Sequence, residues 1–142
     1  MKSHPDFRAQ SILRANAFQN KDSLTEEEME DRLRYFNNNL RGPIYHPDTD
    51  LCVMAENGQF VSGCEALINA PALEADIERV CTHSDFRKRG FARAAIQECL
   101  YSLKFMGIHN AYITGYSEAA IALYGSIGAV DETRAFFYET PK

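Results

Sequence analysis

The sequence predicts an α/β fold with a mixed, mostly antiparallel sheet and flanking helices. Three observations lead to this prediction. The first forty residues have helical periodicity, three strand-like runs lie between residues 51 and 82, and helix and strand signals alternate from residue 90 onward. At 142 residues, the chain has the length of one domain and can bury roughly two-thirds of its unfolded surface. We therefore expect a single domain over residues 1–142.

Residues 1–42 are predicted to form a helical N-terminal part. Apolar residues are spaced among polar ones over 6–20, which favours a first helix. A second helix begins with a capping box, in which the Thr25 hydroxyl and the Glu28 carboxylate each accept a backbone N–H of the first turn. Its apolar residues then recur on one helical face: Met29, Leu33, Phe36 and Leu40.

Three strands are predicted next. An apolar run over 51–55 is followed by Asn57-Gly58, a strong signal for a two-residue hairpin turn, and by a second strand over 60–69. The third strand, over 72–82, shows regular alternation. One face is expected to carry Leu73, Ala75, Ile77 and Cys81, with Arg79 as the exception, and the other Glu74, Asp76, Glu78, Val80 and Thr82. Three carboxylates would then share a face with Val80.

The C-terminal half alternates between the two periods. A helix is expected over 90–106, a brief strand over 111–114, and a second helix capped by Ser117 and ended by Gly128. A last strand is expected over 130–138. This order predicts βα units joined to the antiparallel half.

Composition excludes several classes of protein. The net charge of −5 argues against a protein that grips nucleic acid through an overall positive field. The cysteines have no Cys-x-x-Cys spacing, so we expect no metal site and reduced thiols, as in a cytoplasmic protein. These cysteines are Cys52, Cys64, Cys81 and Cys99. No signal region and no run near 18 apolar residues is found, so no membrane association is expected.

The segment Arg87–Arg93 carries four of the fifteen cations of the chain, between a predicted strand and a predicted helix. A helix N-terminus offers unpaired N–H groups and a positive dipole end, which suit a phosphate. Gly90 permits close approach because it has no side chain. The local pattern indicates a pyrophosphate site; the alternative is a loop whose cations serve only solubility.

Two motifs here resemble those of the GNAT family of N-acetyltransferases. Residues Arg87–Ala92 match the family's (Q/R)-x-x-G-x-(G/A) acyl-CoA motif, and Thr114–Gly128 is similar to its second motif. The resemblance covers about residues 50–140, which would form the cofactor-binding core. The family fold usually begins with a strand, and none is evident before residue 50. The resemblance therefore leaves open a fold that lacks its first strand, one half of a tandem protein, or a homodimer that completes the open sheet edge.

The resemblance implies acetyl-CoA (coenzyme A) as the cofactor. Backbone groups of Val80, Cys81 and Thr82 would pair with the pantetheine arm. Ser117 stands where many members have an asparagine that contacts the cofactor. The pyrophosphate would be held by the N–H groups of Arg87, Lys88, Arg89, Gly90, Phe91 and Ala92.

The resemblance also implies catalytic roles in direct acetyl transfer to a primary amine. Tyr124 would protonate the leaving thiolate, the Val80 N–H would polarise the carbonyl, and Asp76 or Glu78 would act as the base. The alternatives are that Tyr124 is an ordinary core tyrosine and that the carboxylates only form the solvated face of a strand.

The carboxylates favour a cationic acceptor, a small-molecule or peptide amine, whose identity the sequence does not give. The competing function is a non-catalytic acyl-CoA-binding or regulatory module on the same fold.

Overall fold

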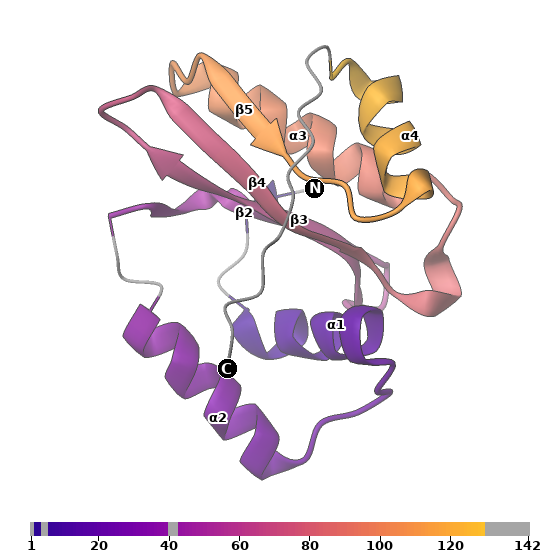
Figure 1. Cartoon of the computed structure of the whole chain (residues 1–142). Coiled ribbons are helices and arrows are strands. Elements are labelled where there is room, and N and C mark those ends of the chain that lie inside the picture. Colours follow the sequence, from indigo (N-terminus) through magenta and orange to yellow (C-terminus); the bar gives the residue numbers. More distant parts are fainter. Residues whose placement is uncertain (1, 4–5, 40–42, 130–142) are drawn as a thin grey trace, which may run out of the picture.

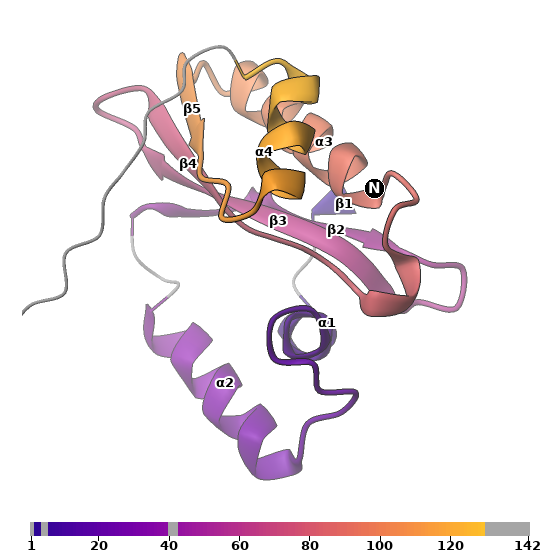
Figure 2. The same cartoon turned by 45° about the vertical axis from the view of Figure 1, so that its right-hand side comes forward.

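A computed structural model describes residues 2–3, 6–39 and 43–129 of the chain. Its five-stranded sheet has the order β1-β2-β3-β4-β5. Helices α1 and α2 cover one face of the sheet, and α3 and α4 cover the other (Figures 1 and 2). The elements are β1 (Lys2–Ser3), α1 (Phe7–Gln19), α2 (Glu26–Asn39), β2 (Tyr45–Met54), β3 (Phe60–Asn69), β4 (Glu74–Thr82), a 3-10 turn (Ser84–Phe86), α3 (Phe91–Phe105), β5 (Asn110–Ile113) and α4 (Glu118–Ile127). The predicted α/β class with a mixed sheet is confirmed.

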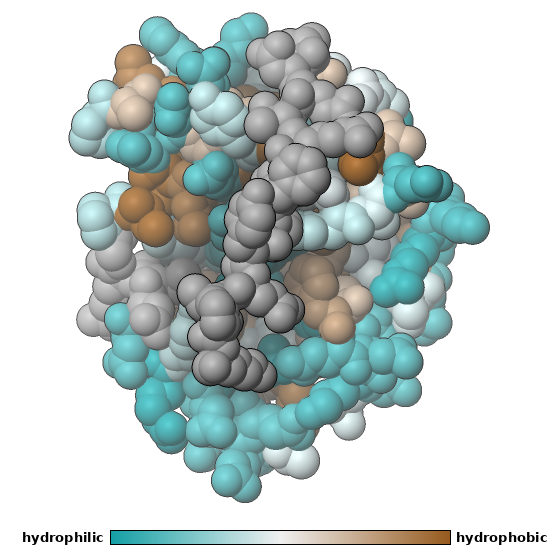
Figure 3. All heavy atoms as spheres, viewed as in Figure 1, coloured by the Kyte–Doolittle hydropathy of each residue, from teal (hydrophilic) through white to brown (hydrophobic). Residues whose placement is uncertain are grey.

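The predicted helix starts form as expected. Glu28 N–H donates to the Thr25 hydroxyl at 3.1 Å and Thr25 N–H donates to the Glu28 carboxylate at 3.2 Å, which confirms the capping box before α2. The Ser117 hydroxyl accepts from Ala120 N–H at 3.1 Å at the start of α4. The side chain of Asp6 caps α1 in the same way. The surface over α2 is hydrophilic (Figure 3), as expected for a helix whose outer face meets water.

The N-terminal edge of the sheet differs from the sequence prediction. A strand does precede residue 50: β1 pairs antiparallel with β2, with Lys2 opposite Cys52 and Ser3 opposite Leu51. β1 has two residues, too few to show any alternation in the sequence. β2 also begins at Tyr45, earlier than its apolar run suggests. The predicted strand over 130–138 lies outside the described residues.

The faces of β4 also differ from the prediction, because the strand contains a β-bulge. Cys81 lies opposite Gly63 and Glu78 opposite Glu65, so three steps along β4 match two steps along β3. The extra residue reverses the alternation, and Arg79 within the bulge has a φ of 53°. Glu78 and Cys81 therefore share a face, and the expectation that the carboxylates lie on the same face as Val80 is wrong.

The bulge places each side of β4 against a different core. On the α3 side, Val80 packs against buried residues that include Ile77 of β4 and Ile96 of α3. On the α1 side, Cys81 packs with Leu13 of α1. Every cysteine of the chain is buried and free. Within the described ranges, no helix is long and apolar enough to cross a membrane.

The sheet opens between β4 and β5. These strands are parallel and pair only from Glu74 with Asn110 to Ile77 with Ile113. β5 ends there while β4 continues to Thr82, and the two strands diverge (Figure 2). Beyond Ile77, this edge of β4 has no strand partner among the described residues.

Gly63 tests the close packing of β2 against β3. A Cβ added at Gly63 would lie 2.7 Å from the Leu51 carbonyl oxygen and 3.1 Å from the Cys52 sulfur. We expect Gly63→Ala to lower the free energy of unfolding by about 1–3 kcal/mol, measured by chemical denaturation.

The matched control is Gly125→Ala inside α4, where an added Cβ meets nothing within 4 Å. Alanine there should leave stability unchanged or raise it by about 0.5–1 kcal/mol. Equal stability losses in the two variants would contradict the close strand contact.

Candidate functional site

A pocket of about 290 Å³ lies where β4 and β5 diverge. It brings together four residues singled out from the sequence: Asp76, Glu78 and Val80 of β4 and Tyr124 of α4. The other lining residues are Phe18, Ile77, Arg79, Tyr112, Thr114 and Tyr116. The opening in the sheet thus exposes a strand edge, two carboxylates and three tyrosines, Tyr124 among them, to one cavity, which we call the cleft pocket.

Tyr124 is held between this pocket and the protein interior. Its side chain packs against the α3 core and also lines an apolar cavity of about 160 Å³ between β4, β5, α3 and α4. Burial raises the pKa of Tyr124, and the nearby Cys64 thiol acts in the same direction. The phenol therefore keeps its proton at neutral pH and can donate a hydrogen bond or a proton into the cleft pocket.

The carboxylates of β4 are not equivalent. Asp76 and Glu78 are exposed and line the cleft pocket. Glu74 does not line it; its carboxylate accepts a hydrogen bond from the Tyr112 hydroxyl at 3.3 Å. Only two of the three acidic residues of this face can therefore serve chemistry in this pocket.

The loop after β4 prepares the N-terminus of α3. Gly90 caps this helix with φ 84°, makes no side-chain cap bond, and has nothing within 4 Å of an added Cβ. The first N–H groups of α3 therefore face open space and suit an oxyanion. The Arg89 guanidinium lies over the rings of Phe86 and Phe91, at 5.6 and 5.4 Å. The predicted pyrophosphate site therefore lies at the start of a helix without a side-chain cap, and the stacked Arg89 guanidinium is part of the same loop.

This loop is tied to the end of α1. Ser84 N–H donates to the Asn16 side-chain oxygen at 2.8 Å, and the Asn16 amide donates to the Ser84 hydroxyl at 3.2 Å. Arg87 donates to the carbonyls of Thr82 at 3.3 Å and of Ala17 at 3.5 Å. Helix α1 and the loop are therefore connected by three hydrogen bonds, and the bond from Arg87 to Thr82 joins the loop to the end of β4.

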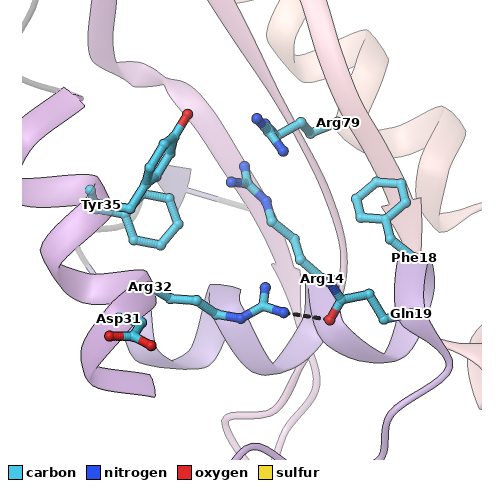
Figure 4. Close-up of a pocket in the computed structure, with 8 residues that line it drawn as sticks. Arg14, Phe18, Gln19, Asp31, Arg32, Tyr35 and Arg79 are labelled. Carbon is cyan, nitrogen blue, oxygen red and sulfur yellow. Dashed lines mark hydrogen bonds between the residues drawn. The ribbon is translucent and has the colours of Figure 1, made fainter. Parts of the chain in front are cut away.

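A second, larger pocket of about 650 Å³ lies between α1, α2 and β4 (Figure 4). Its lining residues are Arg14, Phe18, Gln19, Asp31, Arg32, Tyr35, Phe36 and Arg79. Phe18 and Arg79 also line the cleft pocket, so the two cavities are neighbours. We call this second cavity the arginine pocket.

Sequence reasoning missed the arginine pocket because its walls come from three separate elements. Arg14 lies in a helix of mixed polarity, and nothing in the sequence indicates that it is buried. In the structure only 7% of its surface is exposed. Phe18 and Tyr35 have the spacing of ordinary amphipathic helices, yet both are largely exposed. Of these residues, only Arg79 stands out in the sequence, since it interrupts the alternation of apolar and polar residues in its strand.

Comparisons with known proteins agree with this geometry. The model of the acetyltransferase (GNAT) family matches residues 10–129. No curated protein sequence matches the chain significantly. Among solved structures, the chain resembles an acetyltransferase of Trypanosoma brucei with 15% identity and a TM-score of 0.69, over 95% of this chain and 93% of that one.

Two further structures resemble the chain. One is glucosamine-6-phosphate N-acetyltransferase of Arabidopsis thaliana, with 16% identity, a TM-score of 0.70, and coverage of 99% of this chain and 97% of that one. The other is ribosomal-protein-S18-alanine N-acetyltransferase of Escherichia coli, with 19% identity, a TM-score of 0.67, and coverage of 99% and 83%. Identities this low establish a shared fold only. The family model, however, spans more than half of the sequence, and the chain belongs to the GNAT acetyltransferase family.

Proposed function

We propose that this protein is an acetyl-CoA-dependent N-acetyltransferase that moves an acetyl group directly to a primary amine. The observation that carries the proposal is the cleft pocket, which collects Val80, Tyr124, Asp76 and Glu78 at the open edge of β4. Membership of the GNAT family supports the reaction class. Two structural neighbours are named as N-acetyltransferases that act on amines of different kinds, a sugar phosphate and a protein alanine.

The described residues fit acetyl-CoA. The uncapped start of α3, with Gly90 open to space, suits the pyrophosphate, which the N–H groups of residues 87–92 would hold. The Cys81 carbonyl accepts from the Ser62 hydroxyl of β3 at 2.8 Å and therefore faces β3. Because successive backbone groups of a strand face opposite edges, Val80 and Thr82 would present theirs to the pantetheine arm. The Ser117 hydroxyl accepts from Ala120 and keeps its own proton free to donate.

Acetyl-CoA would supply a thioester, whose C–S bond breaks as the amine nitrogen forms the new C–N bond. The residues of the cleft pocket would manage the charges and protons of this exchange. The Val80 N–H would donate to the carbonyl oxygen. Asp76 or Glu78 would accept the proton that the ammonium group must lose, directly or through one water. Tyr124 would give its phenolic proton to the departing sulfur and regain one from solvent.

Cofactor binding is tested by thermal unfolding. At 100 times its Kd, coenzyme A should stabilise the protein by about 2.7 kcal/mol and raise Tm accordingly. Gly90→Ala should raise the Kd for coenzyme A at least about tenfold, since the new Cβ enters the phosphate approach.

The matched control is Gly107→Ala at the other end of α3. Gly107 has φ 82° and open space around an added Cβ, so it shares the backbone strain but not the site. The affinity of the Gly107→Ala variant for coenzyme A should stay unchanged. Absence of any Tm shift with coenzyme A or acetyl-CoA would overturn the proposal.

The variant Tyr124→Phe tests the proposed role of Tyr124 as the general acid. Loss of the phenolic proton should lower kcat by about 10²–10⁴-fold with an unchanged Kd for coenzyme A, measured by thiol release in a screen of primary amines. Tyr101→Phe is the control, because Tyr101 is exposed on α3 and lines neither pocket of the proposed site. Full activity of Tyr124→Phe would remove the acid role. Cofactor binding without turnover of any amine would instead support the non-catalytic module.

The base is tested by Asp76→Asn and Glu78→Gln. The variant that removes the base should lose about 10²-fold in kcat or more, and its rate should recover as pH rises, because free amine then forms without help. The other variant should retain most of the activity. Equal, near-normal rates for both would exclude the β4 carboxylates as the base.

A further inference from the structure

The arginine pocket places two guanidinium groups against one carboxylate. Glu65 of β3 is buried, and its carboxylate lies 3.6 Å from Nη2 of Arg14 and 3.3 Å from Nε of Arg79. In Figure 4 the side chains of Arg14, from α1, and Arg79, from the β4 bulge, end near each other at the pocket. Two positive charges thus share a single negative one.

Arg14 has donors to spare. It is 7% exposed, and its 3.6 Å contact with Glu65 is too long for a hydrogen bond. Its other contact is with the Phe36 ring, 5.9 Å from the guanidinium carbon to the ring centre. Among the described residues, this guanidinium makes no hydrogen bond, although it carries five N–H groups. None of the Arg14 nitrogens is fully enclosed without a partner, so the donors that make no hydrogen bond are open to the pocket that Arg14 lines.

Among the described residues, no other carboxylate that lines the pocket pairs with Arg14 or Arg79. Arg32 donates to the Gln19 side-chain oxygen, and Asp31 accepts from Arg34 on the outside of α2. Burial raises the pKa of Glu65, while the guanidinium groups of Arg14 and Arg79 act in the opposite direction. The remaining walls are aromatic and suit an apolar linker: Phe18, Tyr35 and Phe36.

The geometry points to a zwitterionic acceptor, an inference that rests on the proposed function. We propose that the acceptor amine carries an oxyanion, a carboxylate or a phosphate, which binds Arg14 and Arg79 in the arginine pocket. Its amine would then pass Phe18 and enter the cleft pocket beside Asp76 and Glu78, because the two pockets share Phe18 and Arg79. Guanidinium groups bind carboxylates and phosphates through two parallel hydrogen bonds, which makes them specific for such groups.

The test is calorimetric titration of amines into the protein saturated with coenzyme A, which needs no turnover. The zwitterionic probes are aminobutanoate, aminohexanoate and aminoethyl phosphate; the matched probes, which lack the anionic group, are butylamine, hexylamine and diaminobutane. At least one zwitterionic probe should bind at least about tenfold more tightly than its matched probe. Preference for aminobutanoate or aminohexanoate identifies a carboxylate site, and preference for aminoethyl phosphate a phosphate site.

The variant Arg79→Gln tests whether the arginines of the pocket bind the anionic group. The ratio of the affinity for the zwitterionic probe to that for its matched probe should fall at least about tenfold. Arg14→Gln would leave Glu65 without its buried counter-ion, so the double variant Arg14→Gln, Glu65→Gln removes both charges and keeps the interior balanced. The same fall is expected there. Arg8→Gln is the control, since Arg8 is exposed on α1, pairs with Glu26 and lines neither pocket.

The outcomes separate the two proposals. If the zwitterionic probes bind no more tightly than their matched probes while coenzyme A still binds, the zwitterionic acceptor is overturned and the acetyltransferase proposal stands. An unchanged affinity ratio in both arginine variants also overturns it. No response to coenzyme A overturns the proposed function itself.

Discussion

One extra residue in β4 organises the site. The bulge at Arg79 reverses the alternation of the strand, so Val80 turns to the α3 core while Asp76 and Glu78 face the opposite side of the sheet. Arg79 takes a left-handed backbone conformation that costs about 1–2 kcal/mol in a residue other than glycine. Its ion pair with Glu65 helps to hold that conformation. The cleft pocket and the arginine pocket meet at this residue.

The chain carries local clusters of positive charge that its negative net charge does not indicate. The net charge is −5, yet cations gather in the loop before α3 and at Arg14 and Arg79, with carboxylates between them. Each basic cluster is small and local, so a net charge cannot reveal it. These positive, negative and positive regions complement the two proposed ligands, because the anionic groups of coenzyme A and of the acceptor would lie on either side of the acceptor's amine.

Much of the architecture could be predicted because local signals agree with the fold. The capping box at Thr25 and the cap at Ser117 each act over a few residues and form as predicted. A hairpin also forms at Asn57-Gly58, but its turn spans Ala55 to Gly58 with a positive φ at Gly58 and not at Asn57, so the predicted two-residue turn is wrong in its geometry. The two motifs led to Tyr124, Asp76, Glu78 and Val80, which line one pocket. β1 was missed because two residues carry no period, and the bulge because its left-handed residue is an arginine rather than a glycine. The arginine pocket arises from tertiary packing and has no local pattern.

The hydrogen bonds between α1 and the loop before α3 have a mechanical consequence. Asn16 and Ala17 hold this loop, and Phe18, the next residue, forms a wall of both pockets. The loop before α3 and a wall of both pockets are therefore held by three consecutive residues of α1. If ligands at the two places affect each other through this helix, linkage requires the effect to be reciprocal: each ligand changes the binding free energy of the other by the same amount.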